Sequence, residues 1–131
     1  MTKLYDYSRI YGFVKRFVML AFRQYYGEFV INGKENLPES GPIIYTSNHT
    51  NALMDPLAIM SVLPSRTPVV YLARSDYFKN KWIRRLMLYF KILPAFRMRE
   101  GLSGVDKNYE VFDHCLEVLA HDRPLGIMPE G

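Results

Sequence analysis

The spacing of apolar side chains changes along the chain near residue 30. Before that point, apolar residues recur with the period of a helix. On a helical wheel they fill one broad arc, which comprises Ile10, Tyr11, Phe13, Val14, Phe17, Val18, Leu20, Ala21, Phe22 and Tyr25. The opposite sector holds the cations Arg9, Lys15, Arg16 and Arg23. This pattern predicts an amphipathic helix within the first 30 residues.

The width of the apolar arc favours a helix that lies in the lipid headgroup boundary of a membrane. The alternative is a helix that packs on the core and keeps its basic side in water. The longest uninterrupted apolar stretch, Phe17 to Phe22, is far shorter than the roughly 20 residues that a membrane-spanning helix needs. We therefore expect the helix to bind a membrane surface without crossing the bilayer.

After the turn residues at 32–33 and 37–42, short apolar runs alternate with helical patterns. These patterns predict strands at 43–47, 68–73, 92–96 and 125–128, and helices at 56–63, 79–90 and 105–121. Asp55, followed by Pro56, is expected to be the N-cap of the first of these helices, and Ser103 is expected to cap the last. Alternating strands and helices predict an α/β fold with a partial, mostly parallel sheet and flanking helices, preceded by the amphipathic helix.

The composition is that of a chain that folds around a core. Hydrophobic residues make up 49%, aromatic residues 15% and charged residues 23%, which excludes the disordered, collagen-like and disulfide-scaffold classes. The single cysteine, Cys115, lies in a helical pattern that predicts a buried apolar side chain rather than a reactive thiol. With no secretory signal at its start, the chain is expected in a reducing, cytosolic environment.

The formal net charge of +4 hides two basic zones. Residues 1–34 carry six cations and two acids, and residues 66–99 carry nine cations and one acid. The stretches 35–65 and 100–131 are acidic, with net charges of −3 and −5. Basic zones attract phosphate groups, nucleic acid or anionic membranes. Because no nucleic-acid recognition motif accompanies the charge, we expect no nucleic-acid partner.

Polar side chains follow three of the predicted strands, at the end where open α/β sheets bind their ligands. Asn48 and His49 follow the first strand, Arg97 follows the third, and Glu130 and Gly131 follow the fourth. The carboxyl ends of parallel strands share one edge of a sheet. We therefore expect an imidazole, a guanidinium and a carboxylate to meet at one rim.

His49 and Asp55 form the most informative pair. A carboxylate that returns to the imidazole holds one tautomer and stabilises the imidazolium, so that the other ring nitrogen accepts a proton from a substrate hydroxyl. This is the activating half of a Ser-His-Asp triad, with the nucleophile supplied by the substrate. The alternative role of Asp55 is helix capping, which is compatible with orienting His49.

Two hydrolytic chemistries are disfavoured. A metal hydrolase needs converging ligands, but His114 and His121 lie about 10 Å apart along one predicted helix, and neither has a recognisable spacing to His49. A serine hydrolase needs a Gly-x-Ser-x-Gly elbow, which the sequence lacks. We expect no metal and no resident cofactor.

Three blocks occur in a fixed order: NHTNALMDP at 48–56, ILPAFR at 92–97 and GIMPEG at 126–131. Together with the lead-in INGKENLP at 31–38, they resemble the first three sequence blocks of the glycerophospholipid acyltransferase superfamily, which includes the 1-acylglycerol-3-phosphate acyltransferases. One block alone would be weak evidence. Three blocks in order make a specific resemblance that extends from about residue 31 to the last residue.

The resemblance implies O-acyl transfer in phospholipid synthesis. His49 would be the general base and Asp55 its orienting partner, and Arg97 would hold the phosphate of the acceptor. The acceptor hydroxyl would attack the thioester carbonyl of acyl-CoA or acyl-carrier protein, which serves as co-substrate. The thiolate would leave without a covalent acyl-enzyme.

The substrate-binding set implied by the resemblance also includes Asn48 of the first block and Glu130 and Gly131 of the third. The implied partners are a lipid bilayer surface, a glycerophosphate or lysophospholipid acceptor, and acyl-CoA or acyl-carrier protein. The second basic zone would meet lipid headgroups, the phosphates of CoA or an acidic carrier protein; its alternative is a solvated helix face. The implied location is peripheral, at the cytoplasmic face of the membrane.

The chain departs from the family pattern at three places. Five residues separate His49 from Asp55, where the usual pattern has four. Lys91 stands where the second block commonly begins with glycine. The chain stops at Gly131, where the family continues with further strands and a fourth block.

We therefore expect two parts in this chain. Residues 1–30 form the amphipathic membrane-interface helix, and residues 31–131 form an acyltransferase domain that is truncated at its C-terminal end. The alternative to an active enzyme is a catalytically inactive N-terminal fragment that acts only as a membrane- or phosphate-binding module.

Overall fold

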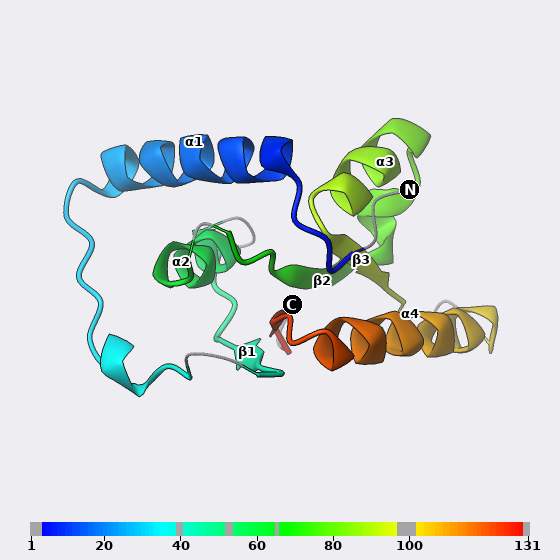
Figure 1. Ribbon diagram of the computed structural model, residues 1–131. Coiled ribbons are helices and arrows are strands. Elements are labelled where there is room, and N and C mark those ends of the chain that lie inside the picture. The colour runs from blue at the N-terminus through cyan, green and yellow to red at the C-terminus, as the bar shows by residue number, and fades with distance from the viewer. Residues whose placement is uncertain (1–3, 39–40, 52–53, 65, 97–101, 130–131) are drawn as a thin grey trace.

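The described part of the chain forms one parallel sheet with helices on both of its faces (Figure 1). The computed structural model describes residues 4–38, 41–51, 54–64, 66–96 and 102–129. In chain order the elements are α1 (Arg9–Tyr26), η1 (Lys34–Asn36), β1 (Ile44–Thr46), α2 (Met54–Val62), β2 (Val70–Arg74), η2 (Ser75–Phe78), α3 (Lys81–Tyr89), β3 (Ile92–Ala95), α4 (Leu102–Ala120) and β4 (Leu125–Ile127). The α/β fold with a parallel sheet, flanking helices and an N-terminal helix is confirmed.

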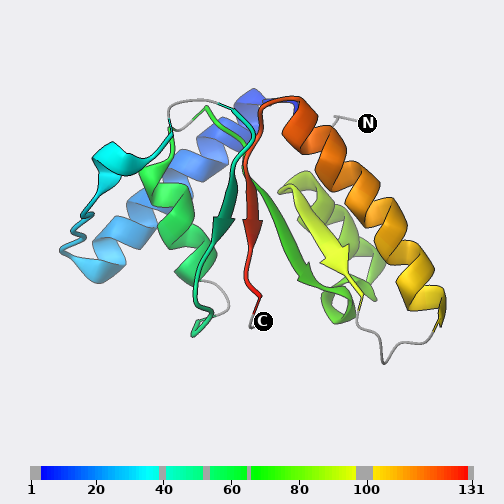
Figure 2. The same cartoon turned by 90° about the horizontal axis from the view of Figure 1, so that it is seen from below.

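The strand order is β1-β4-β2-β3, and all of these pairings are parallel. The sheet separates two helical layers, with α1, α2 and α3 on one face and α4 on the other (Figure 1). Figure 2 shows the four strands running in the same direction. The carboxyl ends of the strands therefore meet at one edge, where ligands of such sheets bind.

A buried core lies between the sheet and α4. It consists of Val70, Leu93, Cys115, Val118 and Leu125, each at most 7% exposed. Cys115 is thus the buried apolar side chain that its helical pattern predicts. Burial raises the pKa of its thiol, which disfavours the reactive thiolate form.

One face of α1 packs on the domain. Tyr11 and Phe22 are buried on this face, and Lys15 lies between them at 4% exposure. The Lys15 ammonium donates hydrogen bonds of 3.0 Å to the carbonyl oxygens of Pro64 and Thr67. The expected place of Lys15 in the exposed cationic sector is therefore wrong, because two carbonyls from a distant segment satisfy its charge inside the fold.

A second face of α1 leaves its apolar side chains in solvent. Their exposed fractions are 66% for Ile10, 73% for Phe13, 66% for Phe17 and 59% for Leu20. The predicted apolar arc thus divides into a packed face and an exposed face. None of the helices within the described ranges is both long and apolar enough to cross a membrane.

Two helices begin earlier than predicted. α2 starts at Met54, so Asp55 lies in its first turn rather than at its N-cap. Asn51 takes the capping role, since its side-chain oxygen accepts from Met54 N at 3.3 Å and its carbonyl accepts from Asp55 N at 3.2 Å. α4 starts at Leu102, which places Ser103 inside the helix rather than at its cap.

The turn between α3 and β3 explains an unusual residue. Lys91 has a φ of +64°, in the left-handed region that favours glycine, and is 4% exposed. Its amide donates to Leu88 O at 3.1 Å, which closes the turn. A glycine would therefore be the unstrained residue at this position.

We predict that Lys91→Gly is more stable than Lys91→Ala by about 1 kcal/mol, because a Cβ is strained at this φ. Both variants lose the same buried ammonium, so their difference isolates the backbone strain. Equilibrium unfolding in urea measures it. An alanine variant as stable as the glycine variant would contradict the left-handed conformation.

The burial of Lys15 predicts a pH-dependent stability. Burial lowers its pKa from the ordinary 10.5 to about 8, so between these values the unfolded chain binds more protons than the folded one. The free energy of unfolding of the wild type should therefore rise relative to Lys15→Met across that pH range, by roughly 3 kcal/mol. Urea unfolding of both proteins from pH 7 to pH 10.5 tests this, since the other titrating groups cancel in the difference. A difference that does not change with pH contradicts it.

Candidate active site

A largely apolar cavity of about 860 Å³ is lined by residues of the sheet and of the helices α1, α2 and α3. Met60, Met87 and Phe90 contribute to its apolar lining. His49 and Arg74 also line it. His49 lies in the connection from β1 to α2, and Arg74 is the last residue of β2. The carboxyl edge of the sheet thus contributes both His49 and Arg74 to the lining of one cavity.

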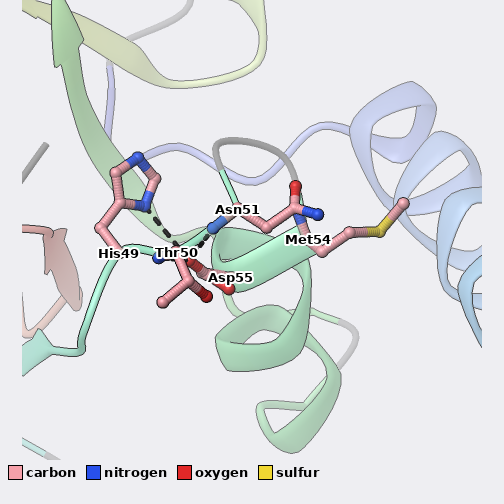
Figure 3. A network of polar contacts seen from close by, with 5 residues as sticks. All are labelled: His49, Thr50, Asn51, Met54 and Asp55. Carbon is pink, nitrogen blue, oxygen red and sulfur yellow. Dashed lines mark hydrogen bonds and ion pairs between the residues drawn. The ribbon is translucent and has the colours of Figure 1, made fainter.

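Asp55 holds the His49 loop against the start of α2 (Figure 3). Its Oδ2 accepts hydrogen bonds of 2.8 Å from the backbone N–H groups of Thr50 and Asn51. The same oxygen lies 3.3 Å from His49 Nδ1, and the two side chains are 20% and 21% exposed. These two hydrogen bonds turn the loop back on itself. The five-residue spacer therefore still allows the carboxylate to reach the imidazole.

This geometry suits His49 to general-base chemistry. A carboxylate beside Nδ1 favours the tautomer that carries its proton there and stabilises the imidazolium. In this tautomer Nε2 is the basic ring nitrogen. Since the His49 side chain lines the cavity, a hydroxyl group bound in the cavity is a suitable proton donor to it.

Tyr71 ties the start of α2 to the sheet. It pairs in register with Gly126 of β4, and a Cβ at position 126 would overlap its ring. The Tyr71 hydroxyl donates to Pro56 O at 2.9 Å, one residue beyond Asp55. Burial raises the pKa of this hydroxyl, which keeps it protonated as a donor. Tyr71 therefore helps to fix the helix turn that carries Asp55, the partner of His49 in what we call the His49–Asp55 dyad. No sequence motif indicated this role.

Arg74 is a site residue that the sequence pattern placed only in a basic zone. Its guanidinium donates to Asp76 at 2.8 Å, and Lys79 lies 3.3 Å from the other oxygen of that carboxylate. These hydrogen bonds lower the pKa of Asp76. The signal that could have revealed Arg74 was present, because it directly follows the predicted strand 68–73, as His49 follows another strand.

Of the other predicted site residues, the structure describes Asn48. Asn48 is exposed and lies outside the described lining of the cavity. Arg97, Glu130 and Gly131 lie outside the described residues. Within the described residues, the structure therefore shows one predicted contact of the site, that of His49 with Asp55.

Asn108 of α4 holds the end of β3. Its side-chain oxygen accepts from Phe96 N at 3.0 Å, and its amide nitrogen donates to Phe96 O at 2.8 Å. The side chain thereby pairs both backbone groups, as a neighbouring strand would. It anchors the residue that directly precedes Arg97 in the sequence, and a helix position carries no strand-end signal that would have indicated this.

Among the residues that the structure describes, no three His, Cys, Asp or Glu side chains converge as a metal site. His114 lies 3.8 Å from Glu117 on the same helix. His121 stacks on the ring of Tyr5 at a centroid distance of 3.7 Å. These two histidines thus have local partners on or beside α4.

Comparison with known proteins gives one match. The protein-family model described as Acyltransferase matches residues 28–131. Searches of the curated proteins and of the solved structures each found no match. The matched segment contains the whole sheet, the His49 loop and every strand that borders the cavity.

Proposed function

Since the chain belongs to the acyltransferase family and acyl transfer is its general activity, we propose that it transfers a fatty acyl group to a hydroxyl of a glycerophosphate acceptor. The donor is a thioester, either acyl-CoA or acyl-carrier protein. The observation that carries this proposal is the 3.3 Å contact of His49 with Asp55 beside an apolar cavity.

The proposed reaction uses His49 as a general base. Its Nε2 takes the proton of the acceptor hydroxyl while Asp55 stabilises the imidazolium, and the hydroxyl oxygen attacks the thioester carbonyl. The tetrahedral intermediate collapses as the carbon–sulfur bond breaks. The imidazolium then gives its proton to the leaving thiolate, so that the products are an ester and a free thiol.

The cavity suits the hydrocarbon part of the acyl donor. Its volume of about 860 Å³ lies within the ~300–1,000 Å³ that is typical of small-molecule sites. Each methylene group moved from water into such a lining contributes about 0.8 kcal/mol. An acyl chain bound there would bring its carbonyl carbon to the His49 end of the cavity.

The acceptor's phosphate is assigned to cations at the same rim. Arg74 lines the cavity together with His49, and a guanidinium binds phosphate through paired N–H groups. Arg97 remains the second predicted cation for this role. Asn48, Glu130 and Gly131 remain predicted substrate-binding residues.

A peripheral position at the cytoplasmic membrane face is part of the proposal. Its support is the exposed apolar face of α1 together with α3, which lies on the same side of the sheet (Figure 1). α3 exposes the apolar residues Trp82, Ile83, Leu86 and Tyr89 and the cations Lys81, Arg84 and Arg85. Aromatic side chains beside cations suit the headgroup region of an anionic bilayer.

Removing the base tests the reaction. His49→Ala should lower thiol release from acyl-CoA with a glycerophosphate acceptor by about 10²–10⁴-fold. Asp55→Asn should lower it as well, because Nδ1 loses its anionic partner. His114→Ala is the matched control, since this histidine is exposed on α4. An unchanged rate in His49→Ala would refute the base assignment. A wild type without activity would favour the inactive binding module.

Vesicle sedimentation tests the membrane surface. Wild-type chain should sediment with phosphatidylglycerol-containing vesicles at low salt and progressively less as salt rises, because salt screens the attraction. The Phe13→Ser/Phe17→Ser variant should remain in the supernatant. The control Tyr109→Ser/Phe112→Ser removes two comparably exposed aromatic residues from α4, on the opposite face of the sheet. Equal losses in both variants would contradict a role for α1.

A further inference from the structure

A second cavity, of about 620 Å³, lies beside the candidate active site. Residues of α1, of the C-terminal half of α2 and of the segment around η1 line it. Lys15 and Met60 line both cavities and therefore form the wall between them. The second cavity is thus separate from the His49–Asp55 dyad, which does not contribute to its lining.

The second cavity has a strongly positive lining. Its cations are Lys15, Arg16, Arg23 and Lys34, and its described lining contains no Asp or Glu. Within the described ranges, Arg16, Arg23 and Lys34 form no ion pair, whereas Arg74 and Lys79 are both paired with Asp76. Clustered cations without acidic partners create a local positive potential that attracts anions.

The exposed cations of this lining belong to two elements. Arg16 and Arg23 are seven residues apart, which places them on the same side of α1 and about 10 Å apart along its axis. Lys34 begins η1, directly after Gly33, whose φ of +77° turns the chain there. Guanidinium groups bind phosphate oxygens through paired N–H donors, and an ammonium adds a point charge. The arrangement suits a phosphate group.

The rest of the lining is mainly apolar and includes Met19, Leu20, Leu37 and Leu63. Leu20 also belongs to the exposed apolar face of α1, at 59% exposure. The cavity is therefore continuous with that face. A ligand that satisfies both kinds of lining carries a phosphate group and a hydrocarbon tail.

We propose that this second cavity binds the phosphate group of an anionic amphiphile, with its tail along the exposed face of α1. The site is a binding site only and involves no acyl transfer. The inference shares the exposed face of α1 with the proposed membrane surface, but it does not depend on acyl transfer, because neither His49 nor Asp55 lines this cavity. Its test measures binding rather than activity, so its failure is distinguishable from a failure of the proposed acyl transfer.

Calorimetric titration of the full chain with hexyl phosphate tests the site. Arg16→Gln/Arg23→Gln/Lys34→Gln should weaken binding about tenfold or more, because several charge-assisted hydrogen bonds are lost. The control Lys81→Gln/Arg84→Gln/Arg85→Gln removes three exposed cations from α3 and should leave the affinity unchanged. The substituted residues of both variants are exposed, so both should melt near the wild-type temperature.

Two further arms decide the ligand and its place. Inorganic phosphate should bind more weakly than hexyl phosphate, and equal affinities would show an adventitious anion site only. Arg74→Gln removes a cation of the other cavity, so the binding that Arg16→Gln/Arg23→Gln/Lys34→Gln weakens should persist in it. If Arg74→Gln weakens hexyl phosphate binding and Arg16→Gln/Arg23→Gln/Lys34→Gln does not, the ligand binds in the cavity beside His49, and the proposal is overturned. A wild type that does not bind hexyl phosphate would also overturn it. So would an equal loss of affinity in this triple variant and in the control variant of α3.

Discussion

The site depends on one carboxylate oxygen. Asp55 Oδ2 accepts two backbone N–H groups of the loop that follows β1 and approaches the imidazole of His49 at 3.3 Å. The two hydrogen bonds hold the loop in a conformation that places His49 beside this carboxylate. The same oxygen that accepts the two N–H groups of the loop thus also lies beside the ring of His49.

Much of this arrangement was predictable from the sequence, because it follows from local rules. Alternating strands and helices require crossover connections, and these produce the parallel sheet and its shared carboxyl edge. That edge singled out His49, and the same rule, applied to the second strand, also selects Arg74. The start of α2 was not predictable in this way, because a capping rule does not show that other amides already hold the Asp55 carboxylate.

The long-range contacts account for the rest. A helical wheel of α1 contains no information on the carbonyls of Pro64 and Thr67, which lie 49 and 52 residues from Lys15 in the sequence. The helical wheel therefore placed Lys15 in the cationic sector, opposite the apolar arc. Asn108 was missed for the same reason, since its partner Phe96 comes from a different element. In each case a polar side chain is placed by backbone groups that only the tertiary fold brings to it.

The fit between Gly126 and Tyr71 restricts how this sheet can change. Gly126 has no side chain, and the ring of Tyr71 on the adjacent strand fills the space where one would lie. The hydroxyl of the same ring donates a hydrogen bond to the carbonyl oxygen of Pro56. A side chain added at 126 would displace the ring, and a smaller residue at 71 would leave a void and remove the hydrogen bond to Pro56. The packing of one strand thus reaches through a single ring to the first turn of α2, so that a substitution at 126 also affects the position of Pro56.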